Sequence, residues 1–303
     1  MLGPTASGKT AVSVQLARKH GCSVVSADSR QLFREMPLGT AAPSEKEMQG
    51  VPHYFIGSHS VSEAYDAGKF EKDALQKLDQ LFSENPVQLL CGGSGMYIDA
   101  VCKGFDELPL RDDVLREELK RIFDTEGIFA LQEKLRLLDP VYFEKADRQN
   151  PHRLMRAIEV CSVSGKPYSE QRKGTAKERP FRILKIGIEL DREALYARIN
   201  ARVDEMVGAG LAGEVRSLEK YRSANALQTV GYKEFFDHFD GKTDLETAVG
   251  LVKQHTRNFA RRQLTWFRKD KSIRWFAPAD IAGMLSAINE ECPDSNVNPI
   301  AIG

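Results

Sequence analysis

The feature that most constrains the fold stands at the start of the chain, where eight residues fit the phosphate-loop pattern G-x-x-x-x-G-K-[ST]. The glycines let successive backbone N–H groups turn inward around phosphate oxygens without a Cβ in the way. The lysine adds a positive charge, and the last threonine offers a hydroxyl to Mg²⁺. We predict that the whole loop binds phosphate, that Lys9 and Thr10 act in catalysis, and that Thr10 is a metal ligand. The loop residues are Gly3, Pro4, Thr5, Ala6, Ser7, Gly8, Lys9 and Thr10.

The residues after the loop predict a helix, whereas those before it are too few for the expected strand. Residues 10–20 indicate a helix with an apolar side at Val12 and Leu16, whose N-terminal dipole favours a bound anion. A phosphate loop normally follows a buried strand, but only Met1 and Leu2 precede Gly3. We therefore expect a few apolar residues to be missing there. The alternative interpretation is a chance glycine turn before a helix.

The next β-prone run, residues 23–27, ends at Asp28. In an open α/β sheet the C-terminal ends of strands line the ligand crevice, so the Asp28 carboxylate should lie near the phosphate loop. An acid there could hold Mg²⁺ through water or accept a proton from a nucleophile. Asp28 could instead cap the N-terminus of a helix.

A third apolar run, residues 87–91, ends in Gly92-Gly93-Ser94-Gly95-Met96-Tyr97 rather than in an acid. Enzymes that transfer phosphoryl groups from a phosphate loop normally carry a second metal-binding carboxylate at such a strand end. The glycines would instead let another backbone approach closely. This pattern indicates that the loop holds a pyrophosphate for another purpose.

Bulk properties exclude some classes of protein. The 303 residues have a formal net charge of zero, so nucleic-acid binding must come from local basic surface. The five cysteines form no C-x-x-C pair, which is typical of reduced thiols in a cytoplasmic protein. No apolar run approaches the roughly 20 residues of a membrane span, and a phosphate loop at the start leaves no room for a signal peptide. We expect a cytoplasmic monomer.

A series of motifs resembles the tRNA dimethylallyltransferase (isopentenyltransferase) family, in the family's order and across nearly the whole chain. Two departures are that Ala42 stands where the family often has Lys and Ser94 where it usually has Thr. The matching blocks are GPTASGKT at 3–10, SADSRQ at 26–31, GTAAP at 39–43, VPHY at 51–54, GGSGMY at 92–97, HRLMRAIEV at 152–160, SGK at 164–166, RINARVDEM at 198–206, GLAGEV at 210–215, VGYKE at 230–234 and TRNFARRQLTWFR at 256–268.

The resemblance implies that the donor is dimethylallyl diphosphate and that the phosphate loop, with Mg²⁺, holds the pyrophosphate leaving group. It implies that Asp28 is the general base and that the acceptor is the exocyclic amine of the adenine 3′-adjacent to the anticodon in tRNA, flipped into the pocket. For Arg153 and Arg156, a salt bridge to Glu159 and neighbouring acids is the alternative. The implied tRNA contacts are Asp28, Ser29, Arg30, Gln31, Ser94, Arg116, His152, Arg153, Leu154, Met155 and Arg156.

The order of strand and helix signals predicts an α/β fold, a P-loop NTPase-like parallel sheet flanked by helices with an inserted helical lobe. We assign residues 1–110 and 181–290 to the core and 111–180 to the lobe. Residues 291–303, which are rich in Pro, Asn and Ser, are predicted to be a disordered tail.

Other readings remain at this point. A small-molecule kinase would need the missing acid before Gly92, and an adenylate isopentenyltransferase would need neither the lobe nor the Arg-rich segment near the C-terminus. A non-catalytic RNA-binding module would leave the phosphate loop unexplained. In the Arg-rich segment, 257–275, basic and aromatic side chains could contact RNA or could belong to an amphipathic core helix.

Overall fold

The structure, a computed structural model, describes residues 1–109, 111–291 and 299–303. These residues form two compact units. The larger, here called the core, consists of Met1–Cys102 and Glu178–Gly303, and the smaller, here called the lobe, is Lys103–Lys177. Our division of the chain at residues 110/111 and 180/181 stays a prediction. No helix in the described ranges is long and apolar enough to cross a membrane.

The core contains a five-stranded parallel sheet in the order β2-β1-β3-β7-β4. Its strands are β1 (Val24–Ser26), β2 (His53–Tyr54), β3 (Val87–Cys91), β4 (Arg182–Leu184) and β7 (Ile300–Ile302). A second parallel pair joins β5 (Ile186–Ile188) to β6 (Arg274–Phe276). Apolar runs such as that of β3 are expected where helices cover both faces of a parallel sheet. The strands predicted at 23–27 and 87–91 are confirmed.

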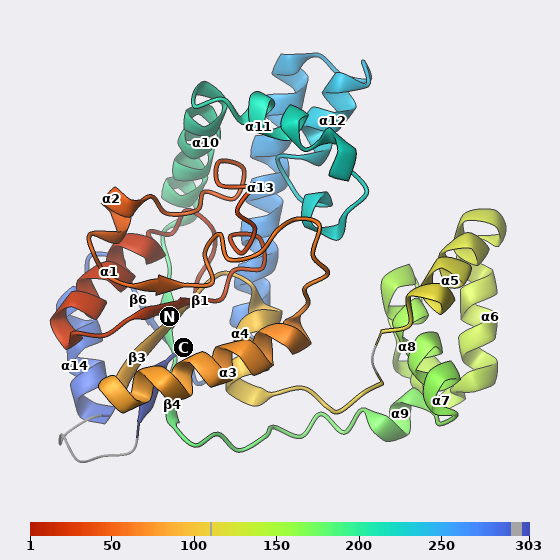
Figure 1. The fold of residues 1–303 in the computed structure, drawn as a ribbon, viewed down its shortest axis with the longest axis horizontal. Coiled ribbons are helices and arrows are strands. Elements are labelled where there is room, and N and C mark those ends of the chain that lie inside the picture. Colours follow the sequence, from red (N-terminus) through yellow and green to blue (C-terminus); the bar gives the residue numbers. More distant parts are fainter. Residues whose placement is uncertain (110, 292–298) are drawn as a thin grey trace. The chain divides into compact units, whose positions relative to one another are not determined.

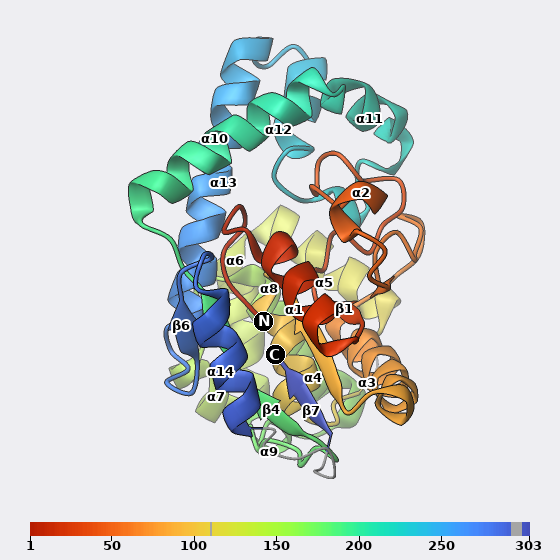
Figure 2. The same cartoon turned by 90° about the vertical axis from the view of Figure 1, so that its left-hand side faces the viewer.

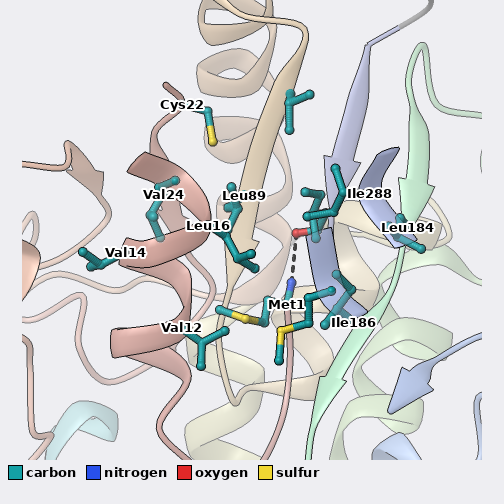
Figure 3. Packing of buried hydrophobic residues seen from close by; sticks show 14 of the residues in the cluster. Met1, Val12, Val14, Leu16, Cys22, Val24, Leu89, Leu184, Ile186 and Ile288 are labelled. Carbon is teal, nitrogen blue, oxygen red and sulfur yellow. Dashed lines mark hydrogen bonds between the residues drawn. The ribbon is translucent and has the colours of Figure 1, made fainter. Parts of the chain in front are cut away.

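Helices cover both faces of this sheet. Helices α1 (Lys9–His20) and α14 (Ile281–Glu291) lie on one face, and α3 (Ala67–Glu84) and α4 (Gly95–Lys103) lie on the other (Figures 1 and 2). Right-handed crossovers require this arrangement, because the chain moves along the sheet in one direction from Leu2 through β1 to β2 and in the opposite direction from β2 through β3 to β4. Apolar side chains of α1, α14 and the central strands form the main cluster of the core (Figure 3). The predicted fold class is confirmed.

A second group of core helices packs beside the phosphate loop. It comprises α10 (Arg192–Gly208), α11 (Leu211–Ser217), α12 (Lys233–Phe239) and the long α13 (Leu245–Phe267), and a short helix α2 (Glu45–Met48) follows the β1 loop. Leu195 and Ile199 of α10 pack with Ala260 of α13 and with Ala6 of the phosphate loop. The loop is therefore held from the side of these helices as well as from the sheet.

The C-terminal strand corrects one prediction. Residues 292–298 of the predicted disordered tail lie outside the described residues, but β7 is buried between β3 and β4. The prediction was wrong there because the apolar residues Ile300–Ile302 satisfy the backbone hydrogen bonds of both neighbouring strands. The polar residues that precede this three-residue strand led us to predict disorder for the whole segment.

Strand β7 and the start of the chain share one strand position. Ile302 pairs with Leu89 and Leu184, and three residues further along both neighbours Leu2 bridges to Gly92 and Gly187. The Met1 amine donates to the Ile302 carbonyl oxygen at 2.9 Å, and burial lowers its pKa to about 5 (Figure 3). Strand β7 and Leu2 thus lie one after the other along the same line of the sheet.

The lobe is helical throughout its described residues. Its helices are α5 (Asp113–Glu126), α6 (Ile128–Leu138), α7 (Pro140–Lys145), α8 (Pro151–Ser164) and α9 (Tyr168–Gln171). Leu119, Leu131 and Leu135 form its apolar centre with Leu154 and Ile158 of α8. Asn150 caps α8 by accepting the N–H of Arg153 at 3.2 Å, and Pro151 occupies the first turn, where it sacrifices no hydrogen bond.

Candidate active site

The phosphate loop has the curled backbone that its sequence predicts. Gly8 has a φ of 94° and ends the loop as the N-cap of α1, and a Cβ on Gly3 would lie 2.6 Å from the Ile188 carbonyl oxygen. Ser7 is fully buried, and its Oγ has no hydrogen-bond partner among the described residues. A curled loop with an unsatisfied buried hydroxyl at a helix N-terminus is suited to an anion.

Lys9 lies within the loop that it would serve. Its Nζ donates to the carbonyl oxygen of Pro4 at 2.6 Å. Burial lowers the pKa of Lys9 to about 8, although the nearby Cys91 and Asp28 act in the opposite direction. Because Asp28 acts to raise the pKa of Lys9, its carboxylate lies near the lysine, and a shared site for the loop and the carboxylate stays a prediction. Thr10 follows in the first turn of α1 and is half-buried.

Asp28 lies two residues after the end of β1 and organises the turn that follows. Its Oδ1 accepts the N–H of Arg30 at 2.9 Å and that of Gln31 at 3.4 Å. Asp28 is therefore held as an Asx-turn residue rather than as the cap of a helix. The two bonds fix the orientation of a half-buried carboxylate beside the phosphate loop.

The glycine-rich segment after β3 packs against the Asp28 loop. A Cβ on Gly92 would collide with the backbone of Ala27, which confirms the expected close approach. Ser94 Oγ accepts the N–H of Ser29 at 2.9 Å and donates to Ser29 Oγ at 3.1 Å. Ser94, predicted to contact tRNA, thus also supports the loop that carries Asp28.

Arg30 and Gln31 hold the surrounding loops. Arg30 Nη1 donates to the Asn225 carbonyl oxygen at 2.9 Å, and burial lowers the pKa of its guanidinium. Gln31 Nε2 donates to the carbonyl oxygens of Thr40 and Ala41 at 3.3 and 3.1 Å. Both residues are half-buried.

Two arginines of α10 were missed in the sequence. The guanidinium nitrogens of Arg198 lie 3.5 and 3.6 Å from the place where a Cβ on Gly8 would stand. Arg202 helps to lower the pKa of Lys9, and burial lowers its own pKa. The signal was the i, i+4 spacing in R-I-N-A-R, which sets both side chains on one face of a helix. They add positive charge beside the phosphate loop.

Gln263 of α13 was also missed. Its side chain is buried and bonds to the phosphate loop and to the segment after β3. The sequence offered a weak signal, a polar residue on the apolar side of an amphipathic helix. Among the aromatic residues of α13, Phe259 and Trp266 are 39% and 40% exposed, whereas Phe267 is buried, so these residues divide between surface and core.

The lobe residues do not all face solvent. Arg116 donates to both oxygens of Glu159 at 2.9 Å, and Arg156 donates to Glu159 at 2.8 Å. The salt bridge named as the alternative for Arg156 is therefore present. Leu154 is fully buried in the lobe, so the predicted tRNA contact cannot come from its side chain. His152 and Arg153 are exposed, and Met155 packs against the lobe's apolar centre.

Comparison with known proteins identifies relatives over nearly the full chain. Residues 31–270 match the family model described as IPP transferase. A tRNA dimethylallyltransferase from Christiangramia forsetii is 50% identical over 276 residues, which are 91% of this chain and 91% of the relative. The tRNA dimethylallyltransferase 1 of Bacteroides thetaiotaomicron is 48% identical over 278 residues, 92% of this chain and 90% of the relative.

Solved structures show the same fold. The full-length tRNA isopentenylpyrophosphate transferase of Bacillus halodurans superposes with a TM-score of 0.70 at 34% identity, covering 96% of both chains. A eukaryotic dimethylallyltransferase acting on tRNA gives a TM-score of 0.74, covering 96% of this chain and 76% of the other. At 23% identity that second likeness concerns the fold alone.

Proposed function

The chain belongs to the IPP transferase family, and from that premise we propose that it transfers a dimethylallyl group from dimethylallyl diphosphate to tRNA. The acceptor is the exocyclic amine of the adenine 3′-adjacent to the anticodon, and pyrophosphate is released. One observation carries the chemistry: the phosphate loop shares a site with Asp28, while β3 ends in Gly92 and Gly93 without the second acid of a phosphoryl-transfer enzyme.

The phosphate loop binds the leaving group. As the allylic carbon–oxygen bond breaks, negative charge develops on the pyrophosphate oxygens. The backbone N–H groups of the loop, the Lys9 ammonium and the N-terminus of α1 are directed at that charge. Arg198 and Arg202, which lie beside Gly8 and Lys9, add to the positive potential. These groups bind the departing pyrophosphate more strongly than the intact ester, and this difference accelerates the reaction.

The residues present fit Mg²⁺ held mainly by the substrate. Across the residues that the structure describes, no group of three or more His, Cys, Asp or Glu side chains could hold a metal ion. Mg²⁺ commonly takes one or two protein ligands together with substrate phosphates and water. The Thr10 hydroxyl, and Asp28 through water, are suited to that role beside the loop in which Ser7 Oγ is unsatisfied. When bound, the ion supplies partial neutralisation of the pyrophosphate charge.

Asp28 is the general base. The adenine amine attacks the allylic carbon, a nitrogen–carbon bond forms, and the carbon–oxygen bond to pyrophosphate breaks. The proton that the amine loses passes to the Asp28 carboxylate, whose orientation is fixed by the N–H groups of Arg30 and Gln31. Removing the target base from its stack is necessary because the amine cannot reach the site within the anticodon loop.

The tRNA contacts are proposed in two groups. Ser29, Arg30, Gln31 and Ser94 surround Asp28 in the core and are suited to the flipped adenine and its neighbours. In the lobe, His152 and Arg153 are exposed and suited to RNA phosphates, although Arg153 Nη1 also lies 4.0 Å from Asp147 Oδ2; Arg116, Met155 and Arg156 belong to the same unit. A tRNA substrate and the lack of a disulfide among the described cysteines support a cytoplasmic location.

The test is transfer of labelled dimethylallyl diphosphate to unmodified tRNA in the presence of Mg²⁺, with free AMP as a competing acceptor and ATP turnover measured in parallel. Label on tRNA alone is the expected result. Label on AMP alone would contradict the proposal and indicate a nucleotide-prenylating enzyme. ATP turnover without any transfer of label would indicate a kinase.

A further inference from the structure

A single buried amide joins three parts of the core that are far apart in sequence. Gln263 lies on α13 and is only 6% exposed. Its Oε1 accepts the backbone N–H of Thr5 at 2.9 Å, and its Nε2 donates to the Gly93 carbonyl oxygen at 2.7 Å. One side chain therefore connects α13, the phosphate loop and the segment after β3.

The Gly93 side of this bridge leads to the base. Ser94 follows Gly93 and bonds to both the N–H and the hydroxyl of Ser29, which is the neighbour of Asp28. The Ser94 N–H also donates to the Ala27 carbonyl oxygen at 3.3 Å. The phosphate loop is thus connected to Asp28 by hydrogen bonds from Thr5 to Gln263, from Gln263 to Gly93 and between Ser94 and Ser29, with peptide bonds joining Gly93 to Ser94 and Ser29 to Asp28.

The surroundings are shaped to this side chain. A Cβ on Gly93 would collide with Gln263 Nε2, so glycine is required for the amide to reach the backbone. One turn further along α13, the Trp266 ring occupies the place where a Cβ on Gly95 would stand, and its Nε1 donates to Asp99 at 3.1 Å. Residues 263 and 266 share a helix face, which lies along this glycine segment.

The chemistry of the side chain is specific. An amide of this length offers an acceptor and a donor at the same time, whereas a carboxylate offers acceptors only and an aliphatic chain offers neither. Both of its bonds are made to backbone groups, one in the phosphate loop and one in the segment after β3.

We propose that Gln263 is a positioning residue for the transfer reaction, which holds the phosphate loop at the correct distance from the loop of the general base. The inference rests on the proposed function. Misplacement of reacting groups by about 1 Å can reduce a rate on the order of 100-fold, so loss of the bridge should appear in catalysis rather than in tRNA binding.

The experiment compares Gln263→Met, which keeps the volume and removes both hydrogen bonds, with Gln263→Glu, which keeps the acceptor for Thr5 and removes the donor for Gly93. Gln254→Met is the matched control, because Gln254 is exposed on the same helix. For each variant the kcat, the KM for dimethylallyl diphosphate, the Kd for tRNA and the Kd for magnesium pyrophosphate are measured on the folded protein.

We expect Gln263→Met to lower kcat/KM for the donor about 100-fold, to weaken magnesium pyrophosphate binding and to leave tRNA affinity within about twofold of the wild type. We expect the kcat/KM of Gln263→Glu to lie between the values of Gln263→Met and the wild type. A structural role alone would lower the folded fraction and hence the maximal rate, without changing the KM for the donor. That result, or wild-type kinetics in Gln263→Met, would overturn the inference.

The control for the underlying function is the wild-type protein. If the wild type fails to transfer label to tRNA, the proposed function is wrong. If the wild type transfers label and Gln263→Met matches Gln254→Met in every constant, only the role of Gln263 is wrong.

Discussion

The core and the lobe are each organised around a buried polar side chain, but the two differ in charge. In the core, the neutral amide of Gln263 bonds only to backbone groups of two loops. In the lobe, the fully buried carboxylate of Glu159 accepts hydrogen bonds from Arg116, from Arg156 and from the N–H of Asp112 at 2.8 Å. Burial alone would raise the pKa of Glu159, but these bonds outweigh it and lower the pKa.

This difference in charge has different consequences for the two regions. A neutral amide can position loops without holding a charge of its own beside a pyrophosphate, and its removal leaves no uncompensated ion. A buried carboxylate binds its partners strongly, but removing it leaves arginines without a counter-charge. Loss of the Gln263 bridge is therefore expected to misplace the loops of the core, whereas loss of Glu159 is expected to lower the stability of the lobe.

The largest expected effect is on the core alone. Asp28→Asn keeps an oxygen that can accept from Arg30 and Gln31 but removes the base, so transfer should fall roughly 10³-fold. The transfer rate of Asp28→Ala should fall at least as far. Affinity for tRNA should stay within a few-fold of the wild type, and lobe stability should not change. Single-turnover transfer and tRNA titration measure these outcomes, and a near-normal rate would remove Asp28 as the base.

An intermediate effect is expected on the lobe alone. Glu159→Ala should destabilise the lobe by about 3 kcal/mol, because Arg116 and Arg156 lose their buried partner. Hydrogen exchange resolved by peptide should show this loss in α5 and α8. Magnesium pyrophosphate binding by the core should remain within twofold of the wild type. The control is Glu118→Ala, an exposed acid on α5. Equal loss of pyrophosphate binding would show that the two regions are not separable.

The smallest expected effect concerns Lys9 and pH. The pKa of Lys9 is lowered to about 8, so the side chain is mostly charged at pH 7 and mostly neutral at pH 9. Because the pyrophosphate prefers the charged form, affinity for the donor should fall about tenfold over that interval. Calorimetric titration without tRNA measures it, with Lys9→Met as a weak but pH-independent reference. The same slope in Lys9→Met would assign the titration to another group.

The pH dependence of donor binding also tests whether the core and the lobe act independently. Glu159→Ala should retain the pH profile of donor binding, because Lys9 belongs to the core and its surroundings are formed by core residues.

Local chemistry explains which parts of the structure the sequence could predict. The phosphate loop, β1 with Asp28, and β3 with Gly92 each follow from a short run whose residues determine their own backbone. The parallel sheet follows from the alternation of strands and helices. Their roles in the reaction stay predictions until the experiments above are performed.

What could not be predicted depends on distant partners. Arg116 and Arg156 resemble RNA-binding residues in sequence, but the buried Glu159 engages both. The role of Gln263 depends on Thr5 and Gly93, which are far from it in sequence and contact it only in the folded protein. Strand β7 is too short for a periodic pattern, and its neighbours in the sheet are more than a hundred residues away in sequence.

The position of β7 in the sheet has a practical consequence for anyone handling the protein. Because β7 pairs with both β3 and β4, substitutions at Ile300–Ile302 would disturb the buried centre of the sheet. The exposed turn at Gly241 is better suited to the insertion of an affinity tag.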